Sequence, residues 1–172
     1  MSEINKDAEA NRVGLGLTLL ERRSIEASIV GPLVRAFTER FGEEASLEVV
    51  SGVIERLARE SGQDMAAILG ESSLEAFATT LDRWKAGGAL ELEILDQGPE
   101  RLDFNVTRCR YAEMYRQLGL ADLGKTLSCL RDFELARGFN PDIELTRTQT
   151  IMEGSPFCDF RFRLKKEISN KA

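Results

Sequence analysis

Histidine is absent from all 172 residues of the chain. Its absence excludes every mechanism that uses an imidazole base, including Ser-His-Asp triads and the Cys-His pairs of papain-like enzymes. It also excludes any metal site built on histidine ligands. Any chemistry must therefore come from thiols, carboxylates, tyrosines and arginines.

Long apolar runs and clusters of basic residues are missing as well. No stretch approaches the roughly 20 apolar residues of a transmembrane helix, and the first residues lack the basic-then-apolar pattern of a secretory signal. The net charge of −6 argues against nucleic acid or an anionic membrane surface as a partner. We therefore expect a cytoplasmic protein with neither kind of partner.

Cysteine is scarce, and Cys109, Cys129 and Cys158 all lie between residues 107 and 164. An odd number of cysteines without a secretory signal indicates reduced thiols rather than a disulfide framework. Their spacings of 20 and 29 residues match no CxxC-type motif, so zinc is disfavoured and no cofactor is expected. The thiols could be core packing or a reactive site, and composition does not choose between these.

The first half of the chain is predicted to be helical. Between residues 19 and 41 apolar side chains recur at helical spacing, and Gly31-Pro32 should kink or interrupt that helix. Further helices are expected over residues 45–60, ending near Gly62, over 65–69, and from Ser72 or Ser73 to about residue 85. The apolar face predicted for the first helix consists of Leu20, Ile25, Ile29, Leu33, Phe37 and Phe41.

After residue 89 the period of the apolar side chains changes from helical to two. Strands are expected over residues 90–94 and 102–106, joined by a turn at 97–100. Two more strands are expected over residues 143–152 and 158–164. Helices over residues 111–118 and 120–137 should lie between the two hairpins.

These elements predict an α+β fold. An N-terminal helical half is followed by a four-stranded, mainly antiparallel sheet with two inserted helices. One domain is expected over residues 19–165, with a flexible N-terminal tail over 1–18 and a loose C-terminal tail over 166–172.

Charged residues lie near two of the thiols and could make them reactive. Cys158 begins the last strand, and Arg147 or Arg161 could favour its thiolate. Asp132 follows Cys129 by three residues, so thiol and carboxylate come close to sharing one helical face. The alternative is that both cysteines only pack in the core, because free cysteine is among the most buried residue types.

Cys109 ends the second strand, just ahead of Tyr111 and Glu113. Arg108 and Arg110 flank it, which would stabilise a thiolate if both arginines pointed inward. Adjacent residues of a strand point to opposite faces, so these side chains cannot all do so.

Arg147 shares a face of the third predicted strand with aliphatic residues. Burying a guanidinium without partners is costly. Either the middle of this strand lines a polar cavity, or the threonine face is the core face. In a cavity Arg147 could bind a substrate carboxylate, and the alternative is an ion pair with Asp132 or Glu113.

Four separated motifs, CRYAEMYRQLG, CLRDFELARGFNP, LTRTQTIMEG and CDFRFR, occur in the chain. With the leading segment RRSIEASIVGPLVRAFTERFGEEA they resemble the L-2-amino-thiazoline-4-carboxylic acid hydrolase family over roughly residues 20–165. The resemblance implies hydrolytic opening of a 2-aminothiazoline ring to N-carbamoyl-cysteine.

The last two strands also resemble the 4-vinyl-reductase-type small-ligand-binding module, through Gly154 and Cys158-Asp159-Phe160. Metal-binding versions of that module tend to have an acid and a cysteine in the preceding strand. This chain has Arg147 and Thr150 there, which puts a zinc site in doubt. The resemblance also implies a homodimer.

Two functions follow from these resemblances. The first is a hydrolase acting on a carbon–nitrogen bond in a small cyclic amidine-like or thiazoline substrate, and the second is a non-catalytic sensor with an apolar pocket. For the hydrolase, the attacking group would be a cysteine thiolate or water activated by a carboxylate. The candidate catalytic residues are Cys158, Cys129, Asp132, Cys109, Glu113 and Tyr111 (a proton donor); the candidate substrate-binding residues are Arg147, Thr148, Gln149 and Phe139.

Overall fold

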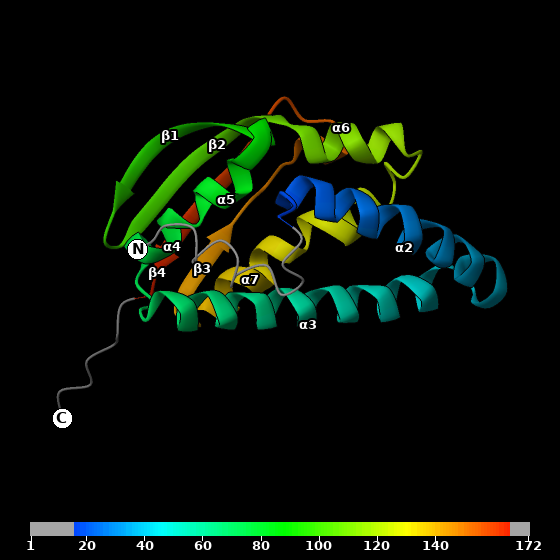
Figure 1. Ribbon diagram of the computed structural model, residues 1–172, viewed down its shortest axis with the longest axis horizontal. Coiled ribbons are helices and arrows are strands. Elements are labelled where there is room, and N and C mark those ends of the chain that lie inside the picture. Colours follow the sequence, from blue (N-terminus) through cyan, green and yellow to red (C-terminus); the bar gives the residue numbers. More distant parts are fainter. Residues whose placement is uncertain (1–15, 166–172) are drawn as a thin grey trace.

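The computed structural model describes residues 16–165, which form helices around a four-stranded antiparallel sheet (Figure 1). The sheet order is β1-β2-β4-β3, and the predicted α+β fold is confirmed. The strands are β1 (Leu90–Gly98), β2 (Arg101–Cys109), β3 (Ile143–Thr146) and β4 (Cys158–Leu164). The α-helices are α2 (Leu19–Phe41), α3 (Glu43–Leu69), α4 (Leu74–Thr79), α5 (Leu81–Lys85), α6 (Arg110–Gln117) and α7 (Arg131–Phe139).

Helix α2 forms as a single element but presents a different face to the core than the sequence predicts. Thr18 and Glu21 make a capping box at its start. The helix is not interrupted at Pro32, which is exposed, so water can satisfy the carbonyl that lacks its N–H partner. The apolar stripe from Ile25 to Phe41 is exposed, and the buried positions are Ala27, Gly31 and Val34.

Small residues explain this difference. A Cβ added at Gly31 would lie 2.5 Å from a methyl carbon of Leu120, so the helix approaches its neighbour closely on the small-residue side. Bulky side chains on that side would hold the helix away from the core. The stripe of large apolar residues is therefore left on the outside.

Helix α3 continues through Gly62, where a helix end was predicted, and ends at Gly70 with φ +73°. Gly62 is buried because α3 crosses α7 there: an added Cβ would overlap the carbonyl oxygen of Leu135 and lie 2.6 Å from the backbone nitrogen of Phe139. Gly138, also predicted as a helix end, lies within α7 and makes the reciprocal contact with the backbone of Arg59. Both glycines are close-approach positions rather than terminators.

The core of the sheet lies on β2 and β4. Their register pairs Leu102 with Phe162, Phe104 with Phe160 and Val106 with Cys158, and all six side chains are buried. Helices α4 and α5, which the structure separates at Thr80 where one helix was predicted, cover this core with Phe77 and Trp84. The fourth strand has the predicted bounds, and it begins with the buried Cys158.

The third strand is much shorter than predicted and ends at Thr146. The carboxylate of Asp159 accepts hydrogen bonds from the backbone N–H groups of Thr148 (3.0 Å) and Gln149 (2.9 Å) and from the Thr148 hydroxyl (2.7 Å). These bonds replace the backbone hydrogen bonds that would continue the pairing of β3 with β4. The chain therefore leaves the sheet and enters a 3₁₀ turn, η3 (Ile151–Glu153). The departure makes room for the Arg147 side chain beside β4.

The long helix predicted over residues 120–137 is also divided. A π-helical turn, η2 (Lys125–Cys129), precedes α7, and Leu130 donates its N–H to the carbonyl of Lys125 at 2.9 Å. Such turns are rare and frequently occur at functional sites. This one places Cys129 and Asp132 against the end of the sheet.

Candidate active site

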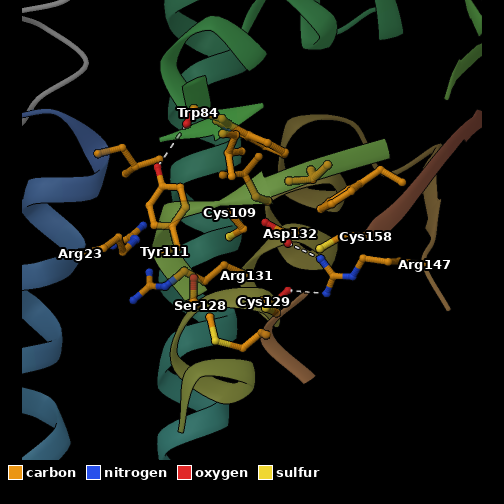
Figure 2. Close-up of a pocket in the computed structure, with 16 residues that line it drawn as sticks. Arg23, Trp84, Cys109, Tyr111, Ser128, Cys129, Arg131, Asp132, Arg147 and Cys158 are labelled. Carbon is orange, nitrogen blue, oxygen red and sulfur yellow. Dashed lines mark hydrogen bonds and ion pairs between the residues drawn. The ribbon is translucent and has the colours of Figure 1, made fainter. Parts of the chain in front are cut away.

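A cavity of about 90 Å³ lies between α2, the β1–β2 hairpin, η2 and α7 (Figure 2). This is several times the ~10–15 Å³ needed for one water molecule. Much of the wall is apolar, with Trp84, Val106, Leu135 and Phe160 among its residues. The polar and thiol side chains that line it are Arg23, Cys109, Tyr111, Ser128, Cys129, Arg131, Asp132, Arg147 and Cys158.

Arg147 and Asp132 form an ion pair in the wall of this cavity. The Arg147 side chain is only 5% exposed, and its Nη1 donates to the Asp132 carboxylate. Its Nη2 donates to the carbonyl oxygen of Cys129 at 2.9 Å. The guanidinium carbon also lies 5.0 Å from the ring centre of Phe133 and 4.9 Å from that of Phe160. Arg147 therefore lines the cavity and also forms an ion pair with Asp132, so both alternatives that the sequence left open for it occur together.

The Asp132 carboxyl group is protonated more readily in the protein than an aspartate side chain is in water. Burial raises the pKa of the Asp132 carboxyl above its ordinary value, although Arg147 acts in the opposite direction. A carboxylate with a raised pKa is a better proton acceptor when ionised. An ionised Asp132 therefore accepts a proton more readily than an ordinary aspartate does.

The three thiols line the same cavity but are poorly disposed to ionise. Burial raises the pKa of Cys109 to about 11, and it also raises the pKa values of Cys129 and Cys158. The sulfur of Cys109 accepts the N–H of Ala112 at 3.4 Å, which caps α6. The sulfur of Cys158 accepts the N–H of Ile151 at 3.2 Å. At neutral pH all three groups are therefore protonated thiols. They pack in the cavity wall, and Cys109 also caps α6.

Alkylation should be slow at all three thiols in the native protein. For Cys109, the shift from 9.0 to about 11 lowers the thiolate fraction about 100-fold, and greater intrinsic nucleophilicity offsets roughly tenfold of that loss. We expect iodoacetamide at pH 8 to label Cys109 at least ~10-fold more slowly than free cysteine, and Cys129 and Cys158 should also react more slowly than free cysteine. Peptide mass spectrometry measures this, with urea-unfolded protein as the control. A cysteine that reacts faster than free cysteine in the native state would contradict the expectation.

Tyr111 also faces the cavity and keeps its proton. Its hydroxyl donates to the carbonyl oxygen of Trp84 at 3.4 Å. Burial raises the pKa of Tyr111 well above its ordinary value. It is therefore a neutral hydrogen-bond donor at the side of the cavity formed by α6 and α5.

Four residues predicted for the site lie outside the cavity wall. Glu113 is paired with Arg108 at 3.0 Å on the surface. Thr148 and Gln149 surround Asp159, and Phe139 packs 5.2 Å from the ring of Phe77 in the sheet core.

Among the charged residues that line the cavity, the sequence analysis missed Arg23 and Arg131. Arg131 stands in the CLRD motif directly before Asp132, so its position was available from the motif. Arg23 lies on α2, and its direction depends on which face of that helix is buried. The apolar stripe indicated the wrong face, so Arg23 could not be found in that way.

The described residues offer no metal site or membrane helix. Within residues 16–165 no group of three or more Cys, Asp or Glu side chains comes together in a way that could hold a metal ion. None of the helices in that range combines the length and apolar character that a membrane crossing requires.

Comparison with known proteins gives one family and several similar structures, which include the following two. The family model of L-2-amino-thiazoline-4-carboxylic acid hydrolase matches residues 22–162. The phenol-responsive sensory domain of the transcription activator PoxR, solved with phenol, is 13% identical with a TM-score of 0.54, over 80% of this chain and 74% of that one.

The second structure is trafficking protein particle complex subunit 3 from Naegleria fowleri, covalently bound to palmitic acid. It is 11% identical with a TM-score of 0.53, over 84% of this chain and 96% of that one. No curated protein matches the chain significantly. At these identities the two structures show a shared fold alone.

Proposed function

Because the chain belongs to the L-2-amino-thiazoline-4-carboxylic acid hydrolase family, we propose that it hydrolyses a small 2-aminothiazoline-like ring. The observation that supports this most is the cavity itself, in which a carboxylate with a raised pKa, a neutral tyrosine and several arginines converge. Convergent polar groups in an otherwise apolar pocket are typical of a catalytic site.

The proposed reaction adds water across the ring and opens it. Water oxygen bonds to the ring carbon between nitrogen and sulfur, and the ring nitrogen takes up a proton. The carbon–sulfur bond then breaks, and the sulfur leaves with the electron pair and is protonated. The product is a carbamoyl amino acid with one new thiol, and no oxidant or reductant is needed.

Asp132 is our choice for the base that takes the proton from water. It lines the cavity and has a raised pKa, whereas Glu113 lies on the surface in an ion pair. A thiolate nucleophile is disfavoured because burial raises the pKa of every cysteine in the wall. Arg147 then serves to position Asp132, and Tyr111 serves as a neutral hydrogen-bond donor on the other side of the ring.

The test is thiol release from L-2-amino-thiazoline-4-carboxylate. Each turnover creates one free thiol, which a colorimetric reagent detects above the constant background of the three protein thiols. Mass spectrometry should show a product heavier than the substrate by one water. Absence of both signals with correctly folded protein would contradict the proposed substrate.

A non-catalytic ligand-binding module is the second candidate. It is supported by the shared fold with the PoxR sensory domain, solved with phenol, and with the subunit bound to palmitic acid. The apolar part of the cavity wall suits a small apolar ligand. Binding of phenol without any turnover of the thiazoline would favour this function over the hydrolase.

A further inference from the structure

Two arginines of the cavity are not used by the proposed catalytic groups. Arg23 comes from α2 and Arg131 from the start of α7, and Figure 2 shows both on the Tyr111 side of the cavity, away from Arg147 in this view. Their side chains are 13% and 12% exposed. Buried guanidinium groups normally have a carboxylate partner each.

Here a single carboxylate serves three arginines. Glu26 accepts hydrogen bonds from Arg22 (2.9 Å) and Arg23, and Arg131 approaches it only to 3.5 Å. The Nε of Arg131 donates to the carbonyl of Leu127 at 2.8 Å. Across residues 16–165 its terminal nitrogens donate no hydrogen bond and make only the 3.5 Å ion pair with Glu26, so they can also bind a ligand in the cavity.

The charge of the cavity is opposite to that of the protein. Its wall carries Arg23, Arg131 and Arg147 against Asp132 alone, in a chain with a net charge of −6. Asp132 is already neutralised by Arg147. Burial and the nearby charge of Arg23 lower the pKa of Arg131 to about 10, while Glu26 and Tyr115 act in the opposite direction. An added anion would stabilise this pair of cations.

We propose that Arg131, assisted by Arg23, binds the carboxylate of the substrate. The proposal rests on the proposed function and extends it, because it assigns the residues that bind the carboxylate of the substrate. Arg147 is held by Asp132, the Cys129 carbonyl and two aromatic rings, so it is less suited to this task. A carboxylate at Arg131 would leave the ring beside Asp132, the next residue of the helix.

A binding experiment tests this without requiring turnover. L-thiazolidine-4-carboxylate, in which a methylene group replaces the amidine carbon so that water cannot add, is titrated calorimetrically against the wild type, with thiazolidine as the probe without a carboxylate. We expect Arg131→Met to weaken binding of the carboxylate about 10- to 100-fold, with a smaller loss for Arg131→Lys. Arg23→Met should also weaken binding. Arg22→Met is the matched control, because Arg22 shares Glu26 but lies outside the cavity wall.

The outcomes separate this inference from the proposed function. Arginine-dependent binding without hydrolysis of the thiazoline would support the carboxylate site and contradict the hydrolase. Hydrolysis with unchanged affinity in folded Arg131→Met and Arg131→Lys proteins would overturn the carboxylate site alone. Equal affinity of the wild type for both probes, or binding of neither, would also overturn it.

A second inference comes from the exposed stripe on the two long helices. Ile25, Ile29, Leu33, Phe37 and Phe41 of α2 are each 45% to 65% exposed. On α3, which runs antiparallel beside it (Figure 1), Val49, Val53 and Leu57 are also exposed. In both helices a stripe residue directly precedes a buried one: Leu33 precedes Val34 on α2, and Val53 precedes Ile54 on α3. One residue corresponds to a rotation of about 100° around the helix axis.

Val34 and Ile54 belong to one buried cluster, so the buried faces of the two helices point toward each other. In antiparallel helices packed in this way, equal rotations bring both stripes to the same side of the pair. Fully exposed large apolar side chains present roughly 150–250 Å² each, so the eight residues leave on the order of 800 Å² uncovered. This exceeds the roughly 300–600 Å² of the largest patch on a typical monomer and equals one partner's share of a standard interface.

We infer that a second copy of this chain covers the stripe. The stripe is self-complementary: about a two-fold axis at Leu33, Ile29 of one copy meets Phe37 of the other, and Ile25 meets Phe41. A two-fold interface requires this pairing of a surface with itself. The net charge of −6 disfavours an anionic lipid surface as the occupant.

Light scattering after gel filtration tests the dimer. The wild type should have twice the chain mass, and Leu33→Glu should have the mass of one chain with an unchanged circular dichroism spectrum. Ile94→Glu, at an exposed apolar position on β1, should leave the dimer intact. A monomeric wild type at 100 µM (about a hundredfold above a micromolar Kd), or a dimer unaffected by Leu33→Glu, would overturn this inference. If deletion of residues 1–15 then produced dimers, the N-terminal segment would be the occupant instead.

Discussion

Replacing Asp132 with asparagine is expected to lower kcat/KM for opening of L-2-amino-thiazoline-4-carboxylate by about 10²- to 10⁴-fold. Asparagine keeps the size of the side chain and an oxygen that can accept from Arg147, but it cannot take a proton from water. The loss should appear mainly in kcat, since the proposed carboxylate site at Arg131 is untouched. Thiol release measures the rate, and calorimetric binding of L-thiazolidine-4-carboxylate shows that the cavity is still formed.

Glu113→Gln is the matched control for this substitution. It removes the other carboxylate suggested by the sequence, which lies on the surface with Arg108. The rate should change less than twofold, because Glu113 is not part of the cavity wall and an exposed ion pair contributes little to the fold. Cys158→Ser and Cys129→Ser should retain turnover. Full activity in Asp132→Asn, together with loss of activity in one serine variant, would move the chemistry to that thiol.

The pH profile provides a second readout for the same residue. Burial raises the pKa of Asp132 above 3.8, and the base acts only when ionised. The rate constant kcat/KM should therefore fall as the pH drops through this raised pKa, at a higher pH than for an ordinary aspartate. Arg147→Met removes the cation that opposes the shift and should move the acid limb to still higher pH.

Much of the sheet could be predicted because alternation of apolar and polar residues has only one interpretation there. The bounds of β4 follow from a period of two with one dry face, whereas the sequence left the direction of Arg147 as one of two alternatives. The early end of the third strand could not be predicted in this way. It depends on Asp159, eleven residues after Thr148. The carboxylate of Asp159 accepts the backbone N–H groups of Thr148 and Gln149, which therefore do not bond to the neighbouring strand.

The packing of the helices was harder to predict, because an apolar stripe in the sequence does not indicate whether the core or another molecule covers it. On α2 the most periodic apolar residues are exposed, and small residues make the core contact. The same error hid Arg23, which lies on the buried side. Of the candidate site, the thiols, Asp132, Tyr111 and Arg147 were placed together through their motifs, while the arrangement of Arg23 and Arg131 needed the packing of α2 on α7.

Replacing Gly62 with alanine should lower the free energy of unfolding by about 2–4 kcal/mol, which corresponds to a fall in Tm of roughly 5–10 °C for a chain of this size. The new methyl group would overlap the carbonyl oxygen of Leu135 and lie 2.6 Å from the Phe139 nitrogen, and both are backbone atoms that cannot move aside. Helices α3 and α7 would therefore have to separate. Thermal unfolding followed by circular dichroism measures the change.

Gly52→Ala, in the same helix, is the control for helix propensity. Gly52 is exposed and an added Cβ would have no neighbour within 4 Å, so this change should stabilise the protein by about 0.5–1 kcal/mol. Gly138→Ala should resemble Gly62→Ala, because it overlaps the backbone of Arg59 at the same crossing. The free energy of unfolding of the double variant should fall by less than the sum of the two single losses. One methyl group already separates the helices, so the second causes less additional overlap. If Gly62→Ala instead stabilised the protein as Gly52→Ala does, the close crossing of α3 and α7 would be wrong, and with it the placement of Asp132 and Arg131 against the cavity.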